Sequence, residues 1–214
     1  MEKPALDYHI IASGSTGNAV RVGNILFDCG VPFKVLKEDL YLTDYLLITH
    51  DHYDHVKPAT LRSIVREFPN IRIFSTYRVA RMNDSVVSIN LDYLPLELGD
   101  KLVYAVEVPH DVVTYGYIVQ GPDTAYVYAT DLGDTKSLTD FCQGLGVRFD
   151  AVFLEANYDP EKLRALGNEW RGSYNPYHDS TSRHLSTDES ALFYARFKKE
   201  GGKHIELHKS HRFY

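Results

Sequence analysis

Residues 49–55 read T-H-D-H-Y-D-H and follow an apolar run of the chain. The ligand-type side chains His50, His52, Asp54 and His55 fall within six residues of one another. Extended backbone would direct His50 and His52 the same way, because side chains alternate along a strand. A turn after them would let Asp54 and His55 face a second position. Since imidazole and carboxylate groups suit zinc, iron or manganese, the stretch predicts a metal site rather than a structural cluster.

Runs of β-type and helix-type sequence surround this motif. Helical spacing of apolar residues predicts helices over residues 57–68 and 187–199, with Pro58 in the first turn of one and Thr187 as the cap of the other. Strands come first in pairs and then with intervening helices, which indicates an α/β sandwich. The predicted strands are rich in β-branched and aromatic residues and cover residues 8–12, 25–28, 45–49, 71–75, 102–108, 115–120, 125–130, 151–156 and 204–207.

The composition is that of an ordinary globular protein. The 214 residues are 44% hydrophobic and 24% charged, which predicts a single domain over residues 1–214 with a core that needs no disulfides. Two cysteines make no disulfide framework and favour a reducing compartment.

The sequence shows no signal peptide and no membrane-length apolar run, so we expect a cytoplasmic protein without a membrane partner. Residues 167–183 are the clearest loop, either a substrate-facing lid or a surface segment.

Several motifs resemble those of the metallo-β-lactamase superfamily. After H-x-H-x-D-H, the similarity continues through S-G-S-T-G-N, I-L-F-D-C-G, V-P-H-D, A-T-D-L-G, L-E-A-N-Y-D, R-H-L-S and L-H-K-S-H-R-F. Together they are most similar to those of the WalJ/YycJ group of exonucleases, and the last two are similar to those of ribonuclease Z. The departures Tyr158, Arg183 and Lys209 leave the substrate and the end polarity open. The resemblance implies a four-layer αββα metallo-β-lactamase-like sandwich.

The resemblance also implies a set of ligands for two divalent metal ions, zinc before manganese or iron. His50, His52 and His110 would hold one ion. Asp54, His55 and His208 would hold the other. Asp131 would bridge the two. Such a pair can activate a hydroxide and polarise a phosphoryl oxygen.

Further residues are assigned to the site by the same resemblance. His184, Glu155 and Asp54 would act in catalysis, with Glu155 orienting His184 and raising its pKa. His184 would assist the leaving group. Asp28 would accept a hydrogen bond from a metal-binding histidine, although a turn residue is the alternative. Ser13, Ser15 and Asn18 would lie beside the metals or contact a substrate phosphate, or would only shape a glycine-rich turn.

The function expected from these features is metal-dependent hydrolysis of a phosphodiester, with a DNA nuclease of the 5′ exonuclease type favoured. A small-molecule phosphodiesterase acting on a cyclic nucleotide is the runner-up, because the net charge of −6 provides no broad nucleic-acid surface. A non-catalytic, metal-stabilised binding module is the alternative from a different class. A homo-oligomer is compatible with the sequence and would supply a larger nucleic-acid surface.

Overall fold

The computed structural model describes residues 6–90, 94–169 and 183–210. Two compact units divide the chain, one over residues 1–92 and the other over residues 93–214. Each unit contains a six-stranded sheet. Most of the loop predicted over residues 167–183 lies outside the described residues, so its role as a lid stays a prediction.

The first unit places four parallel strands after an antiparallel pair. Its sheet has the order β1-β2-β3-β4-β5-β6, and β3 to β6 run parallel. Leu36 of α1 and Ile64 of α2 share one apolar core with strand residues such as Leu46. The elements are β1 (Tyr8–Ala12), β2 (Ala19–Val22), β3 (Ile25–Phe27), α1 (Phe33–Leu40), β4 (Tyr45–Leu47), α2 (Pro58–Glu67), β5 (Arg72–Ser75), α3 (Tyr77–Ala80) and β6 (Val86–Ser88).

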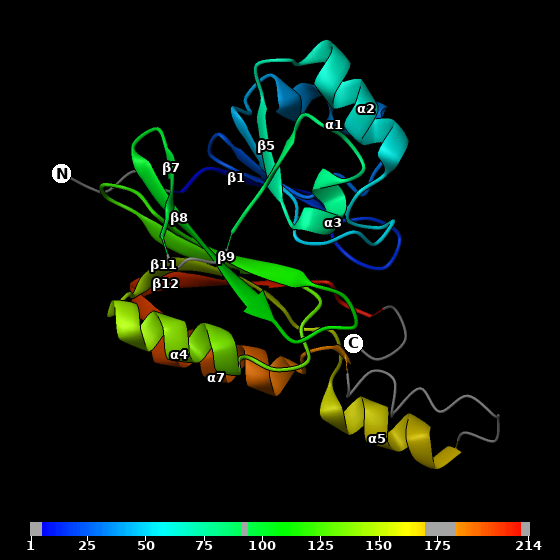
Figure 1. Ribbon diagram of the computed structural model, residues 1–214. Coiled ribbons are helices and arrows are strands. Elements are labelled where there is room, and N and C mark those ends of the chain that lie inside the picture. The colour runs from blue at the N-terminus through cyan, green and yellow to red at the C-terminus, as the bar shows by residue number, and fades with distance from the viewer. Residues whose placement is uncertain (1–5, 91–93, 170–182, 211–214) are drawn as a thin grey trace. The chain divides into compact units, whose positions relative to one another are not determined.

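The second unit has the order β12-β11-β10-β9-β8-β7, with β10, β11 and β12 parallel to one another. Helices α4 and α7 lie side by side along one face of this sheet (Figure 1), where Leu138 and Phe193 join its apolar core. The elements are β7 (Leu96–Leu98), β8 (Lys101–Val108), β9 (Thr114–Gln120), β10 (Ala125–Ala129), α4 (Lys136–Leu145), β11 (Phe149–Glu155), α5 (Pro160–Glu169), α7 (Thr187–Phe197) and β12 (Lys198–Leu207).

Strand direction determines which loops meet in each unit. β9 pairs antiparallel with both β8 and β10, so β8 runs in the same direction as β10, β11 and β12. The carboxyl ends of these four strands therefore share one edge of the second sheet. In the first unit, β1 runs with β3, β4 and β5 for the same reason. Each unit thus gathers the loops that carry the predicted site residues at a single sheet edge.

The boundaries of several elements differ from the predicted ones. Ser186, not Thr187, caps α7, because its side chain accepts from the Glu189 backbone N–H while the Glu189 carboxylate accepts from Ser186. The helix ends at Phe197 instead of residue 199, since the chain continues into β12 at Lys198. No helix in the part of the chain that the structure describes combines the length and apolar character needed to cross a bilayer.

Candidate metal centre

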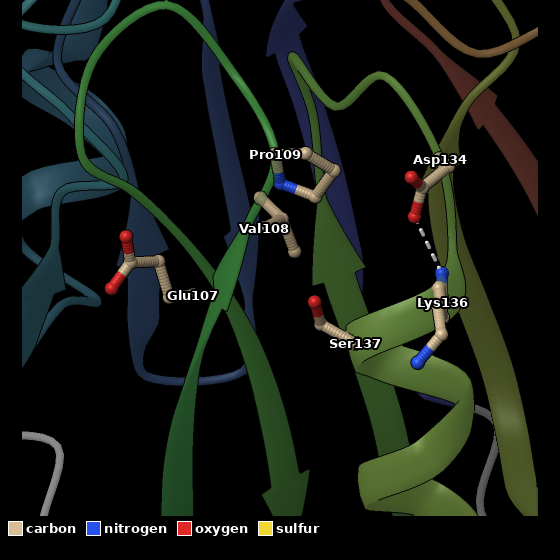
Figure 2. A pocket seen from close by; sticks show the side chains of 6 residues that line it. All are labelled: Glu107, Val108, Pro109, Asp134, Lys136 and Ser137. Atoms are coloured by element: carbon tan, nitrogen blue, oxygen red, sulfur yellow. Dashed lines mark hydrogen bonds between the residues drawn. The ribbon is translucent and has the colours of Figure 1, made fainter.

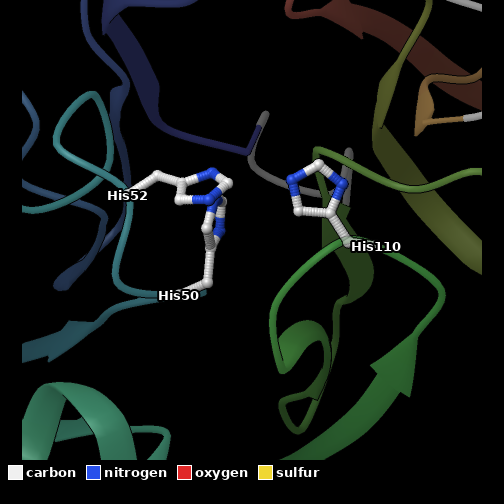
Figure 3. Close-up of side chains that lie close together, drawn as sticks. All are labelled: His50, His52 and His110. Atoms are coloured by element: carbon white, nitrogen blue, oxygen red, sulfur yellow. The ribbon is translucent and has the colours of Figure 1, made fainter. Parts of the chain in front are cut away.

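The first cluster of ligand-type side chains, His50, His52, Asp54 and His55, lies on the loop between β4 and α2. Figure 3 shows His50 and His52 next to each other on this loop, with ring centroids 4.6 Å apart. The rings of His50 and His55 are 4.1 Å apart, and both residues are fully buried. The backbone N–H of His55 donates to the carbonyl of His52, which closes the predicted turn. One short loop therefore carries all three imidazoles.

Asp28 supports this cluster from the end of β3. Its carboxylate accepts from His55 Nδ1 at 2.8 Å and from the Thr49 backbone N–H at 2.8 Å. The Thr49 hydroxyl lies 3.0 Å from Asp28 Oδ1 and 2.9 Å from His50 Nδ1. Asp28 is itself completely buried, so these donors stabilise a carboxylate that burial alone would disfavour. With Nδ1 bonded to Asp28, His55 would offer its Nε2 atom to a metal ion.

Asn18 and Gly30 hold the same loop from the other side. Asn18 Nδ2 lies 2.8 Å from His55 Nε2, and the Asn18 backbone N–H donates to the Asp54 carbonyl at 2.7 Å. Asn18 is 1% exposed, which favours a supporting role over contact with a substrate. A Cβ added at Gly30 would lie 1.7 Å from the Asp54 carbonyl oxygen, so only glycine fits there. Ser15 is exposed and Ser13 half-buried, and their contact with substrate stays a prediction.

The second cluster consists of Asp131, Glu155, His184 and His208. Asp131 follows β10, Glu155 ends β11 and His208 follows β12 directly, so the parallel strands bring all three to one edge. Each of the four residues offers one ligand atom, and these atoms all lie within 4.8 Å of one another. Four segments far apart in the sequence thus build one group of metal-type donors.

Glu155 lies at the centre of the second cluster. Its Oε1 accepts from His184 Nδ1 at 2.7 Å and lies 3.1 Å from His208 Nδ1. Its Oε2 accepts the Leu132 backbone N–H at 3.0 Å and lies 3.4 Å from the Leu185 nitrogen. Glu155 is fully buried, and this ring of donors satisfies its charge. The predicted Glu155–His184 pair is therefore present in the structure.

Opposing effects set the protonation of this pair. Burial alone would raise the pKa of Glu155, but the hydrogen bonds from His184 and His208 hold that pKa below its ordinary value. Burial alone would lower the pKa of His184, but the hydrogen bond to Glu155 raises it above its ordinary value. Glu155 therefore favours a protonated His184, as expected from the sequence.

Three residues other than glycine adopt positive φ angles in the described part of the chain. They are Asp28 at 62°, Asp131 at 55° and His208 at 51°. Left-handed backbone is costly for such residues, by about 1–3 kcal/mol, and tends to cluster at functional sites. It explains why the strand predicted over residues 25–28 ends at Phe27. All three were predicted site residues, so the backbone strain coincides with the proposed centre.

His110 lies on the loop after β8, as Figure 3 shows. The Gly133 backbone N–H donates to the Pro109 carbonyl at 2.8 Å, which ties this loop to the one that carries Asp131. Beside them lies a hollow of about 370 Å³ (Figure 2) lined by Val108, Pro109, Ser137 and three charged residues. The charged residues are Glu107, Asp134 and Lys136. The hollow thus adjoins the loops that carry two predicted ligands.

The donor chemistry of both clusters suits a divalent ion. Imidazole and carboxylate are the ligands that zinc and similar metals prefer. In each cluster a buried carboxylate lies within hydrogen-bond distance of a histidine Nδ1, at 2.8 Å for Asp28 and His55 and at 3.1 Å for Glu155 and His208. Sequence reasoning missed Thr49, which contacts Asp28 and His50, and Asn157, whose amide donates to the His208 carbonyl at 2.8 Å. Both stand inside quoted motifs, T-H-D-H and L-E-A-N, and that position is the signal that could have found them.

The chain also matches known proteins in sequence. The sequence pattern described as the beta-lactamase superfamily domain matches residues 23–201. Exodeoxyribonuclease WalJ of Streptococcus pneumoniae serotype 2 is 26% identical over 215 residues, covering 89% of this chain and 76% of that protein. Exodeoxyribonuclease YycJ of Bacillus anthracis is 26% identical over 221 residues, covering 94% and 81%. The resemblance to the WalJ/YycJ group seen in the motifs is confirmed.

Solved structures show the same fold. The human tRNase Z, short form, has a TM-score of 0.69 to this chain at 17% identity, covering 96% of this chain and 93% of its own. At this identity the likeness shows the fold alone. The metallo-β-lactamase-like α/β class predicted from the sequence is confirmed.

Proposed function

Because this chain belongs to the beta-lactamase superfamily and is a metal-dependent hydrolase, we propose that it cleaves phosphodiester bonds, with DNA as the favoured substrate. Removal of nucleotides from a 5′ end is the favoured mode. The names of the WalJ and YycJ relatives support a nucleic-acid substrate. The observation that carries the proposal is the second cluster, where buried Glu155 holds His184 beside Asp131 and His208.

The seven residues implied by the resemblance would hold two divalent ions, with zinc first. His50, His52 and His110 would hold one, Asp54, His55 and His208 the other, and Asp131 would bridge them. When bound, such ions supply Lewis-acid polarisation and a hydroxide at neutral pH. We further propose that residues 1–214 form a single metallo-β-lactamase-like domain.

The protein's own side chains would divide the remaining work. His184, charged through its bond to Glu155, would donate a proton to the oxygen that leaves the phosphorus. Its Nδ1 lies 2.7 Å from Glu155, so Nε2 is the atom that would face the leaving group. General-acid help of this kind contributes roughly 10²–10⁴ in rate. Asp28 would keep His55 in the ligand tautomer through the 2.8 Å bond.

A small phosphodiester such as a cyclic nucleotide is the second candidate. The net charge of −6 favours it, because affinity for nucleic acid depends largely on basic residues that neutralise phosphates. A homo-oligomer would reverse that judgement. A non-catalytic module is disfavoured because the relatives that the chain matches are exodeoxyribonucleases by name. The buried free thiols of Cys29 and Cys142 support the reducing, cytoplasmic compartment expected from the sequence.

A two-stage assay tests the proposal. Hydrolysis of bis-p-nitrophenyl phosphate should require metal, stop with a chelator and return with zinc or manganese. Strands of DNA and RNA labelled at the 5′ or the 3′ end, together with cyclic nucleotides, should then show which substrate is cleaved and from which end. Full metal content with no turnover of any of these would contradict the proposed function and favour the binding module.

A further inference from the structure

Tyr53 stands between two predicted ligands, His52 and Asp54, and points its ring outward. Its neighbours His52 and Asp54 are half-buried, whereas 69% of Tyr53 is exposed. The Lys57 ammonium lies 5.3 Å from the centre of its ring, within the range of a cation–π contact. The chain thus presents an accessible aromatic ring, braced by a cation, one residue away from the atoms that would hold the metals.

A second cation contacts the same loop from α3. Arg78 of α3 donates through Nε to Asp51 at 2.8 Å, and 44% of its side chain is exposed. Asp51 is the residue between His50 and His52, so the contact places a guanidinium beside the metal-binding motif. Exposed aromatic rings interleaved with cations are the pattern that binds single-stranded nucleic acid, since bases stack on the rings and cations neutralise phosphates.

We propose that Tyr53, braced by Lys57, stacks an unpaired nucleobase of the substrate next to the phosphate being cleaved. This inference rests on the proposed function and names its substrate: a nucleotide whose base is not paired, either in a single strand or in a cyclic mononucleotide. Stacking serves any base, because every base has an aromatic face. The site would therefore accept any base sequence, and it would reject duplex ends whose base pairs stay closed.

Tyr41 shows what an exposed tyrosine without this role looks like. It is 67% exposed, nearly the same as Tyr53, but its ring packs edge-on against Phe68 with centroids 5.1 Å apart. It lies before β4, whereas Tyr53 follows that strand, so the two stand toward opposite edges of the first sheet. Tyr41 is therefore a matched control for size, chemistry and exposure.

A double-mutant cycle between protein and substrate tests the inference. Single-stranded DNA is assayed with its bases intact or with an abasic site placed at each of the first four positions in turn. Tyr53→Ala should raise KM for intact strands by about 5- to 150-fold, the range of base–aromatic stacking. An abasic site at one of these positions should raise KM of the wild-type protein by a similar factor. The same abasic site should change KM of Tyr53→Ala little. Tyr53→Trp should retain activity, Tyr53→Leu should behave as Tyr53→Ala, and Tyr41→Ala should match the wild type.

The outcomes separate this inference from the proposed function. Additive losses at every position, or full activity of both Tyr53→Ala and Tyr53→Leu with normal metal content, overturn the stacking role and leave the hydrolase intact. Assays with a cyclic nucleotide and with its analogue that lacks the base show whether the stacked base belongs to a cyclic mononucleotide or to a single strand. If the wild-type protein cleaves nothing, fluorescence anisotropy of the same labelled strands still decides: equal binding by the wild type and Tyr53→Ala overturns the inference, and base-dependent loss of binding supports it.

Discussion

The two clusters reach similar chemistry by different routes. The first cluster takes all its ligand-type side chains from the single loop that links β4 to α2, with Asp28 as a buried support. The second cluster takes one side chain from each of four segments spread between residues 131 and 208. Local sequence therefore builds the first, whereas the register of three parallel strands builds the second. Substitutions that disturb the sheet should affect the second cluster more than the first.

Asp131→Ala gives the largest expected effect. A bridging carboxylate holds two ions and offsets their repulsion, so its loss should remove several kcal/mol of transition-state stabilisation, about 10³-fold in rate. Metal content should fall as well. Metal analysis beside the bis-p-nitrophenyl phosphate assay measures both. Normal stoichiometry with normal turnover would refute the bridging role.

His184→Ala should act on rate and spare the metals. Cleavage of natural DNA should slow by about 10²–10⁴-fold, because its alkoxide leaving group needs a proton. Cleavage of the p-nitrophenyl ester should slow much less, since nitrophenolate leaves unaided. Glu155→Gln should give the same pattern, more weakly. Loss of metal would instead make His184 a ligand, and an equal loss with both substrates would assign it to phosphate binding.

Asp28→Asn tests how far the first cluster depends on its buried carboxylate. An amide cannot replace the charge that holds His55 Nδ1 at 2.8 Å, so metal affinity or activity should fall by about 10- to 100-fold. Asn157→Ala, which removes a contact to His208, is the counterpart in the second cluster. Competition with a fluorescent chelator measures the affinities. Unchanged affinity in Asp28→Asn would make Asp28 only a turn residue.

Gly30→Ala gives the smallest expected effect of the four on chemistry but a clear one on stability. Its Cβ would collide with the Asp54 carbonyl carbon at 2.2 Å as well as with the oxygen, so the loop must move. We expect a loss of about 1–3 kcal/mol in the free energy of unfolding, measured by urea denaturation. Gly144→Ala, inside α4, is the control: apart from its chain neighbours and the backbone of its own helix, nothing lies within 4 Å of the added Cβ. This substitution should stabilise the protein by up to about 1 kcal/mol. Equal stability of Gly30→Ala and the wild type would show that the loop yields freely.

The sequence by itself determined the first cluster and the kind of fold. Ligands packed within six residues after an apolar strand can meet through one turn, so their spacing was enough. The Glu155–His184 pair followed from the resemblance of motifs and not from spacing. The start of α7 was predicted one residue too late. Ser186 and Thr187 both carry a hydroxyl that could cap the helix, and the capping box with Glu189 selects Ser186.

Only the tertiary structure decided which residues of the second cluster contact one another. That Glu155 serves both His184 and His208 depends on β11 lying between β10 and β12, which no local pattern encodes. The positive φ of Asp28, Asp131 and His208 is likewise invisible in the sequence, since none is glycine. Contacts between residues that are distant in sequence arise from sheet register and close packing. Those are properties of the folded chain as a whole, and short motifs carry no record of them.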